Sequence, residues 1–315
     1  NSLLVSEEEI AEAEKKVSIE LKAAITLAYN NIRTFHAAQV FQGKKITTLP
    51  GVTCWQKAVA IEKVGLYIPG GTAPLFSTVL MLATPAQIAG CKEIILCTPP
   101  DKEGKIHPAI LYAAKLTGIS RIFKAGGVQA IGAMAYGTES IPKVYKIFGP
   151  GNQYVTAAKQ QVSLRDVAID MPAGPSEVAV LADETANPVF VAADLLSQAE
   201  HDELASAILV TTSEELAKKV SDETDKFIKE LSRGEIIQKS LDNYGYILVT
   251  DTMDEAIETA NEIASEHLEI QTKNPFDVMT KIRNAGAIFL GEYSSEPLGD
   301  YFAGPNHVLP TNGTA

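Results

Sequence analysis

Between Glu93 and Thr138 the chain reads EIILCTPPDKEGKIHPAILYAAKLTGISRIFKAGGVQAIGAMAYGT, and this segment indicates the fold class. It opens on the apolar run EIILCTPP, which predicts a buried strand, and continues into HPAILYAAKLTGI, whose length and apolar spacing predict a helix. SRIFKAG then predicts a second strand, and VQAIGAMAYGT predicts a second helix. Strands and helices in this rhythm are typical of a parallel sheet that is covered on both faces.

The same rhythm extends in both directions from this stretch. Towards the N-terminus, AVAIEKVGLYI predicts a strand, residues 75–88 a helix, and residues 6 to about 40 one or two long helices. Towards the C-terminus, VYKIFGPG predicts a strand and NQYVTAAKQQV a helix. From residue 177 the alternation repeats in EVAVLAD, PVFVAADLLSQAEHD, SAILVTT, EELAKKVSDETDKFIKEL, YILVT, MDEAIETANEIA and GAIFLG. Two halves of similar pattern predict a duplicated, doubly wound α/β unit.

Composition and charge narrow the class of protein. The 315 residues include 27 basic and 39 acidic side chains, which gives a net charge of −12. An acidic chain without a basic stripe argues against nucleic acid or an anionic membrane as partner, but it does not exclude a dinucleotide, which backbone N–H groups hold. Cys54, Cys91 and Cys97 have no metal-binding spacing and predict reduced thiols that serve as small core residues in a cytoplasmic protein. The longest apolar run, near 76–83, is too short to span a bilayer, and no signal peptide opens the chain.

Polar residues suited to a metal occur in the second half of the chain. Gln198 and His201 stand three apart on a predicted helix, so we expect both side chains to project from one face. Zinc accepts imidazole nitrogen and carboxylate oxygen, and an amide oxygen is an unusual further donor. Asp300 offers a carboxylate much later in the chain, and spacing alone cannot bring it to His201. The alternative is a polar helix face with a surface histidine.

A carboxylate and an imidazole stand side by side at Glu266 and His267. The pair comes directly after a segment with a helical pattern. Neighbouring residues point in different directions, so the two side chains can reach two parts of one substrate. Histidine moves protons near neutral pH, and glutamate activates water beside an electrophile. The alternative is a histidine at the C-terminal end of a helix, favoured by the helix dipole. His307 lies in PNHVLP, a loop stiffened by two prolines.

Glycine-rich turns after predicted strands suit a phosphate group. They lie at 67–71, at 126–129, at 149–152 and at 172–177, where Ser176 adds a hydroxyl. The turn at 149–152 fails the dinucleotide fingerprint, because Tyr154 occupies the third glycine position and Pro150 lacks an N–H. A dinucleotide would therefore be held here in a non-standard and weak way. The alternative for each is a plain turn.

Taken together, several long strings resemble the histidinol dehydrogenase family. They are GLYIPGGTAPLFSTVLMLATPAQIAGC, KIFGPGNQYVTAAK, AIDMPAGPSEV, DLLSQAEH, EHLEIQT and GDYFAGPNHVLPT, and the match runs along the whole chain. The resemblance implies the four-electron oxidation of L-histidinol to L-histidine through the aldehyde, with two NAD and one zinc ion per site. The residues it implies are Gln198, His201 and Asp300 as zinc ligands, Glu266 and His267 as the catalytic pair, Ser176 and His307 with Gln198, His201, His267 and Asp300 at the substrate, and Tyr67, Gln129 and Asn152 at NAD.

The resemblance also implies an architecture. It has two related incomplete Rossmann-like domains with parallel sheets and an N-terminal helical segment at 1–42. Residues 1–67 with 177–315 would form the zinc-binding and catalytic domain, and 68–176 the domain that contacts NAD. The family forms an intertwined homodimer in which the partner's C-terminal tail completes each site with a histidine ligand and a glutamate. This sequence lacks that tail, so we expect these residues alone to lack a complete site. A zinc hydrolase and a non-catalytic binding domain are the alternatives from other classes.

Overall fold

The computed structural model describes residues 2–70, 74–172 and 174–305. The chain forms two compact units. The first runs up to Pro172 and takes in residues 302–305, and the second runs from 174 to Tyr301. Among the described residues, no helix has the length and apolar character needed to cross a membrane.

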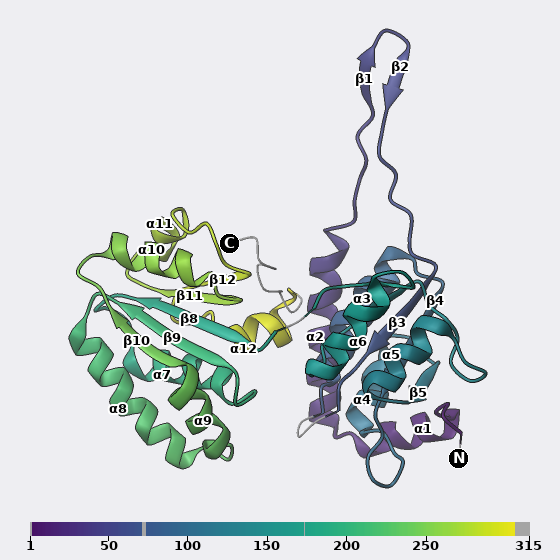
Figure 1. Cartoon of the computed structure of the whole chain (residues 1–315), viewed down its shortest axis with the longest axis horizontal. Coiled ribbons are helices and arrows are strands. Elements are labelled where there is room, and N and C mark those ends of the chain that lie inside the picture. Colours follow the sequence, from purple (N-terminus) through teal and green to yellow (C-terminus); the bar gives the residue numbers. More distant parts are fainter. Residues whose placement is uncertain (1, 71–73, 173, 306–315) are drawn as a thin grey trace. The chain divides into compact units, whose positions relative to one another are not determined.

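The first unit is built on a parallel five-stranded sheet with the strand order β5-β4-β3-β6-β7. Its strands are β3 (Lys63–Tyr67), β4 (Glu93–Thr98), β5 (Ile122–Lys124), β6 (Lys146–Phe148) and β7 (Ala168–Ile169). The helices between them are α3 (Phe76–Ala89), α4 (Pro108–Leu116), α5 (Gly127–Tyr136) and α6 (Gln153–Ser163). This confirms the alternation predicted from Glu93 to Thr138. Because β3 comes first in sequence and lies centrally, the chain winds to one side of it and then to the other (Figure 1), as in doubly wound folds.

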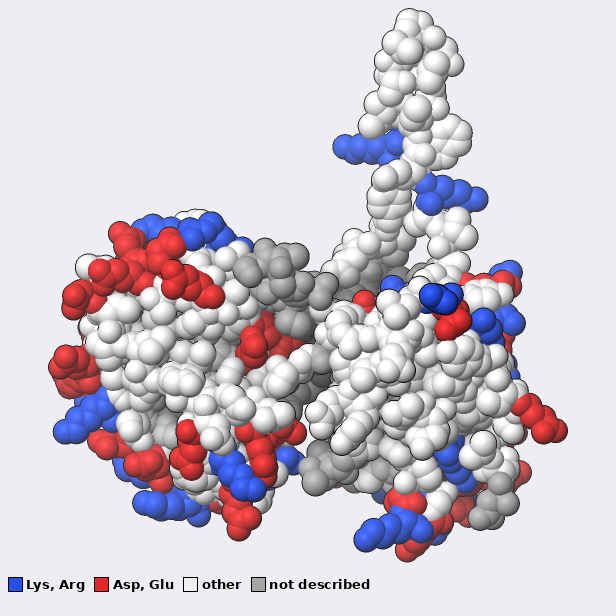
Figure 2. Space-filling view, in the orientation of Figure 1, with Lys and Arg blue, Asp and Glu red and all other residues white. Residues whose placement is uncertain are grey.

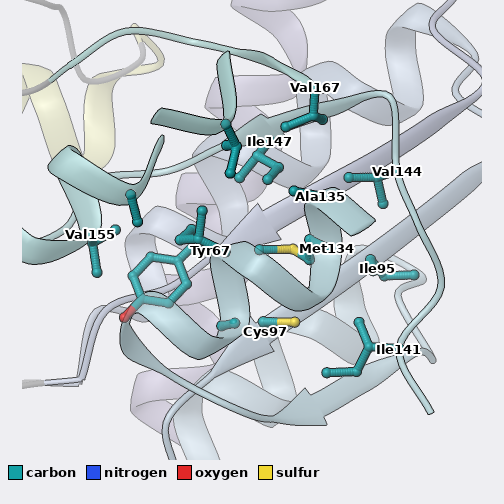
Figure 3. Packing of buried hydrophobic residues seen from close by; sticks show 14 of the residues in the cluster. Tyr67, Ile95, Cys97, Met134, Ala135, Ile141, Val144, Ile147, Val155 and Val167 are labelled. Atoms are coloured by element: carbon teal, nitrogen blue, oxygen red, sulfur yellow. The ribbon is translucent and has the colours of Figure 1, made fainter. Parts of the chain in front are cut away.

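One face of this sheet packs on α5 and α6. Figure 3 shows Tyr67, Cys97 and Ile147 from the strands meeting Met134 and Val155 from the two helices, and all five are buried. The thiol of Cys97 acts as a small core group, as predicted, and burial raises its pKa to about 12. The apolar runs of the central strands are therefore explained by burial on both faces of the sheet.

Two helices precede the sheet, as the sequence predicts: α1 (Glu7–Lys16) and α2 (Ile19–Ala37). Ser6 and Glu9 form a capping box at the start of α1, and Ser18 caps α2. The two helices pack on α4 and α3 respectively. Residues 1–67, expected to join 177–315 in one domain, are grouped here with the first sheet instead, because these helices pack on it and β3 pairs with β4 and β6.

A hairpin projects from the first unit (Figure 1). Its strands are β1 (Ile46–Leu49) and β2 (Val52–Cys54), which pair antiparallel around a turn at Pro50–Gly51. We call residues 38–61, which contain it, the arm. Nearly all of the arm is exposed, including Cys54, which is therefore not the core thiol that was predicted. The strand predicted from AVAIEKVGLYI is shorter than expected, since only its second half forms β3.

The second unit repeats the topology of the first. Its parallel sheet has the strand order β10-β9-β8-β11-β12, again with the first strand of the unit in the middle. The strands are β8 (Glu177–Ala182), β9 (Ser206–Thr211), β10 (Gly245–Val249), β11 (His267–Gln271) and β12 (Ala287–Leu290). The helices are α7 (Pro188–Ala199), α8 (Glu214–Glu230), α9 (Gly234–Tyr244), α10 (Met253–Ile263), α11 (Pro275–Met279) and α12 (Glu296–Leu298), and a π-helical turn follows at Gly299–Ala303. The expected pair of related, Rossmann-like sheets is therefore confirmed.

Side chains of β8 alternate between two cores. Val178, Val180 and Ala182 pack with α7, α8 and α9, whereas Ala179 and Leu181 pack with α10 and α11. The sequence analysis missed the helices α9, α11 and α12 and the central strand β11. Their positions matter because β11 begins with one of the predicted catalytic residues.

Candidate active site

His267 is the first residue of β11, between β8 and β12. His267 is therefore not the histidine at the C-terminal end of a helix that the alternative interpretation described. The helix α10 ends at Ile263, and Ala264 adopts a left-handed conformation with φ 52°, which stops the helix before the chain enters the sheet. The imidazole is thereby placed at the amino-terminal edge of the sheet, and only 4% of the residue is exposed.

Both ring nitrogens of His267 face acceptors. Nδ1 lies 3.1 Å from the backbone oxygen of Glu177, and Nε2 lies 3.2 Å from Oδ2 of Asp300. A ring that donates from both nitrogens is an imidazolium. Burial alone would lower the pKa of His267, but the hydrogen bond to Asp300 and the negative charges of Asp300, Glu266 and Glu296 outweigh it and raise the pKa to about 9.

Glu266 lies on the other side of this imidazole. Its Oε2 is 3.9 Å from Nδ1 of His267, and its backbone N–H donates to Oε2 of Glu177 at 3.3 Å. Burial raises the pKa of Glu266 to about 7, although the charge of His267 opposes the shift. A carboxyl group with that pKa can accept or release a proton near neutral pH.

Asp300 and Glu296 approach His267 from the end of the unit. They are four residues apart, across α12 and the π-helical turn, and both are buried. One donor atom from each of His267, Glu296 and Asp300 lies within 4.8 Å of the others. Burial raises the pKa of Glu296 to about 7. Sequence reasoning missed Glu296, although its helical spacing from Asp300 was a usable signal.

Gln198 and His201 come from the end of α7. Gln198 lies inside the helix and is 1% exposed, but the helix ends at Ala199, so the expectation that both residues share one helix face is wrong. The N–H of His201 donates to the backbone oxygen of Gln198, and Tyr301, the neighbour of Asp300, brings its hydroxyl to 3.5 Å from Nε2 of His201. One side of His201 stays exposed, yet protein atoms around the ring displace water and lower its pKa.

A second layer of acids supports this group. The N–H of Glu296 donates to Oε1 of Glu269 at 2.9 Å, and Nε2 of Gln271 donates to Glu269 (3.1 Å) and to Asp194 (2.6 Å). Asp194 and Glu269 are both buried and hydrogen-bonded to each other, so burial raises the pKa of each and the pair retains a proton. No signal in the sequence separated these acids from surface carboxylates.

The residues present fit a bound cation. Oε1 of Gln198, Oδ1 of Asp300 and Oε2 of Glu296 are buried and have no hydrogen-bond partner within the described part of the chain. Buried acceptors without partners are unfavourable unless a donor or a cation satisfies them. The amide, imidazole and carboxylate groups of Gln198, His201 and Asp300 are of the types that zinc accepts.

The glycine turns of the first unit lie at the carboxyl edge of its sheet. The hydroxyl of Tyr67, at the end of β3, accepts from the N–H of Gly127 at the start of α5. Gln129 is exposed in the first turn of α5, and Asn152 caps α6, with its Oδ1 accepting from the N–H groups of Tyr154 and Val155. The edge where strand order reverses, between β3 and its neighbours, is where doubly wound sheets bind ligands.

Two residues predicted to contact the substrate, Ser176 and His307, remain to be located. Ser176 is half-buried and directly precedes β8, beside Glu177, whose carbonyl contacts His267. His307 lies outside the described residues.

The fold and these residues define an α/β enzyme of the doubly wound class, with glycine turns at the carboxyl sheet edge of one unit and a buried acid–base group in the other. The sequence profile described as histidinol dehydrogenase matches residues 1–315. The histidinol dehydrogenase of Bacteroides fragilis is 71% identical over 314 residues, covering 100% of this chain and 73% of its own length. That of Bacteroides thetaiotaomicron is 68% identical over 315 residues, with the same coverage. The crystal structure of histidinol dehydrogenase from Elizabethkingia anophelis matches with a TM-score of 0.97 at 54% identity, over 99% of this chain and 72% of that one.

The chain belongs to the histidinol dehydrogenase family, oxidoreductases of histidine biosynthesis.

Proposed function

We propose that the protein oxidises L-histidinol to L-histidine through the aldehyde, in two successive NAD-linked steps at a site that holds one zinc ion. The observation that supports this most directly is the placement of His267 between the Glu177 carbonyl and the Asp300 carboxylate, with Glu266 beside it. One carboxyl group and one imidazole whose pKa values are raised to about 7 and about 9 suit a reaction that must move several protons.

In this proposal His267 acts as the neutral imidazole, a form that a bound zinc ion would favour by offsetting the charge of Asp300. The neutral ring takes the proton of the alcohol as hydride leaves the neighbouring carbon for NAD. Glu266 then removes a proton from the water that attacks the aldehyde. His267, after releasing its first proton to solvent, accepts the proton of the resulting hydrate as the second hydride leaves for NAD. Ser176, next to Glu177, and His307 would contact the substrate. The surrounding burial excludes bulk water and retains the aldehyde between the two steps.

Gln198, His201 and Asp300 would hold the zinc ion, and Glu296, which lies close to Asp300, would add a carboxylate beside them. When bound, zinc supplies positive charge that offsets the carboxylate of Asp300 and orients the polar groups of the substrate. Tyr67, Gln129 and Asn152, at the carboxyl edge of the first sheet, would contact NAD, which accepts the hydride when bound.

The experiment is a stoichiometric assay with L-histidinol, NAD and zinc. Two NADH are expected for each histidine formed, with no free aldehyde accumulating. One NADH per turnover with aldehyde released would contradict the two-step proposal. Activity that is unchanged after zinc is removed and proven absent by elemental analysis would contradict the metal.

We also propose a homodimer in which the arm docks on a second copy of the chain. Ile46, Leu49 and Trp55 are 59%, 65% and 60% exposed, although an isolated two-stranded hairpin is at best marginally stable in water. Figure 2 shows blue side chains but no red ones on the arm, which carries three lysines and no acid at residues 38–61, in a chain of net charge −12. A second, acidic copy therefore complements it.

A further inference from the structure

A buried lysine in the first unit takes no part in the acid–base group. Lys159 lies on α6 with 2% of its surface exposed, although lysine is rarely buried unless it is paired. Its Nζ donates to the backbone oxygens of Gly149 at 2.8 Å and Met171 at 3.3 Å, and it forms an ion pair with Asp170. Each of the three ammonium hydrogens thus has an acceptor.

Asp170 completes the arrangement from the other side. Its Oδ2 accepts from the N–H of Gly149 at 2.7 Å, and its Oδ1 accepts from the N–H of Met171 at 2.8 Å. The pair therefore holds both backbone polar groups of Gly149. Since Gly149 directly follows β6 and Asp170 directly follows β7, the pair also joins the carboxyl ends of these two strands.

The turn that begins at Gly149 is sterically crowded and has few hydrogen-bond donors of its own to fix its shape. Gly149 has φ 127°, and a Cβ there would lie 2.1 Å from the backbone oxygen of Tyr67, so the turn presses directly on the end of β3. Pro150 has no N–H to donate, and the turn ends at Asn152, the cap of α6. Buried ion pairs add little net stability over an apolar pair, so the local geometry that they fix is the more informative feature.

We propose that Lys159 and Asp170 are positioning residues that hold the Gly149–Asn152 turn in the shape that receives NAD. The inference rests on the proposed NAD-binding role of the first unit. It makes the pair necessary for cofactor affinity and not for the chemistry at His267.

The test compares Lys159→Met, Asp170→Asn and the double variant with the parent protein. NAD binding is measured by calorimetry, the KM values for NAD and L-histidinol by steady-state kinetics, and folding by thermal unfolding. Removing both charges leaves no unpaired buried ion, so we expect the double variant to fold. A displaced turn should weaken NAD binding and raise its KM about tenfold or more, while the KM for L-histidinol and the zinc content stay unchanged.

Two further variants complete the design. Lys159→Arg keeps the charge and the donors and should recover part of the NAD affinity. Lys92→Met, at an exposed lysine beside the opposite edge of the sheet, is the matched control and should behave as the parent. A folded double variant that binds NAD as tightly as the parent would overturn the positioning role alone. A parent that does not bind NAD in calorimetry would instead overturn the proposed function on which it rests.

Discussion

His267 is the single residue whose surroundings most constrain the chemistry. It is held from both ring nitrogens, by Glu177 and by Asp300, so its ring plane and position are fixed before any substrate arrives. Replacing it with asparagine keeps a polar group of similar size but removes the titratable site. We expect His267→Asn to slow turnover by about 10²–10⁴-fold while zinc content, measured by elemental analysis, is retained. Turnover near that of the parent would remove His267 from the mechanism.

Replacing Glu266 should affect the two proposed oxidation steps to different extents. In the proposed reaction it acts on water, which enters only after the aldehyde has formed. We therefore expect Glu266→Gln to slow the oxidation of the aldehyde more than that of the alcohol, when NADH formation is followed from each substrate separately. Equal losses from both substrates would argue against its role with water.

For single residues, the sequence identifies the chemical types in the site better than it identifies which of them lie together in space. Glu266, His267 and Asp300 are found by resemblance, and the structure places them together. Glu296 escapes notice because a glutamate before proline is usually a surface residue, and only the tertiary fold buries it beside His267.

The elements that the sequence analysis misses are those whose local pattern is weak. In β11 every residue is buried, but three of its five side chains are polar, so the apolar run that marks other central strands is absent. In α9 the buried positions are only Ile237 and Ser240. By contrast β8 and β9, with runs of Val, Leu, Ile and Ala, are recovered almost to the residue.

The paired acids Asp194 on α7 and Glu269 on β11 predict how the stability of the protein depends on pH. Asp194 and Glu269 have raised pKa values, so the folded protein keeps a proton that the unfolded chain releases. The unfolding free energy then falls as pH rises above about 4, because the unfolded state binds fewer protons there than the folded state. Asp194→Asn should relieve this: its amide can donate to Glu269 and its oxygen can accept from Gln271, as the Asp194 oxygen does now.

We expect Asp194→Asn to match the parent near pH 4 and to be more stable by about 1 kcal/mol near pH 8, the scale of one pKa unit. Urea unfolding across this pH range, on protein freed of zinc and again with zinc added, measures the difference. Asp242→Asn, at an exposed acid on α9, is the matched control. A variant whose advantage over the parent does not grow with pH would contradict the shared proton.

Across the whole molecule, the two units share one topology but use opposite edges of their sheets. In the first unit the glycine turns lie at the carboxyl edge, whereas in the second His267 and Glu177 open β11 and β8 at the amino edge. The carboxyl edge of the second sheet is closed by Asp183, whose Oδ2 accepts from the N–H of Lys273 at 2.8 Å. A carboxylate at that position disfavours phosphate, which supports the proposal that NAD binds to the first unit and not at this edge of the second.

The exposed apolar residues of the arm lead to a prediction about the proposed homodimer. Leu49 and Trp55 are exposed within the chain, so replacing both with glutamate should leave each unit folded, as thermal unfolding and circular dichroism would show. If a second copy covers the arm, the same change buries two unpaired carboxylates, and the dimer should dissociate to monomer in size-exclusion chromatography with light scattering. Leu164→Glu, at a residue of the first unit that is 81% exposed, adds the same charge away from the arm and should leave the dimer intact. An arm variant that stays as dimeric as this control would place the dimer contact elsewhere.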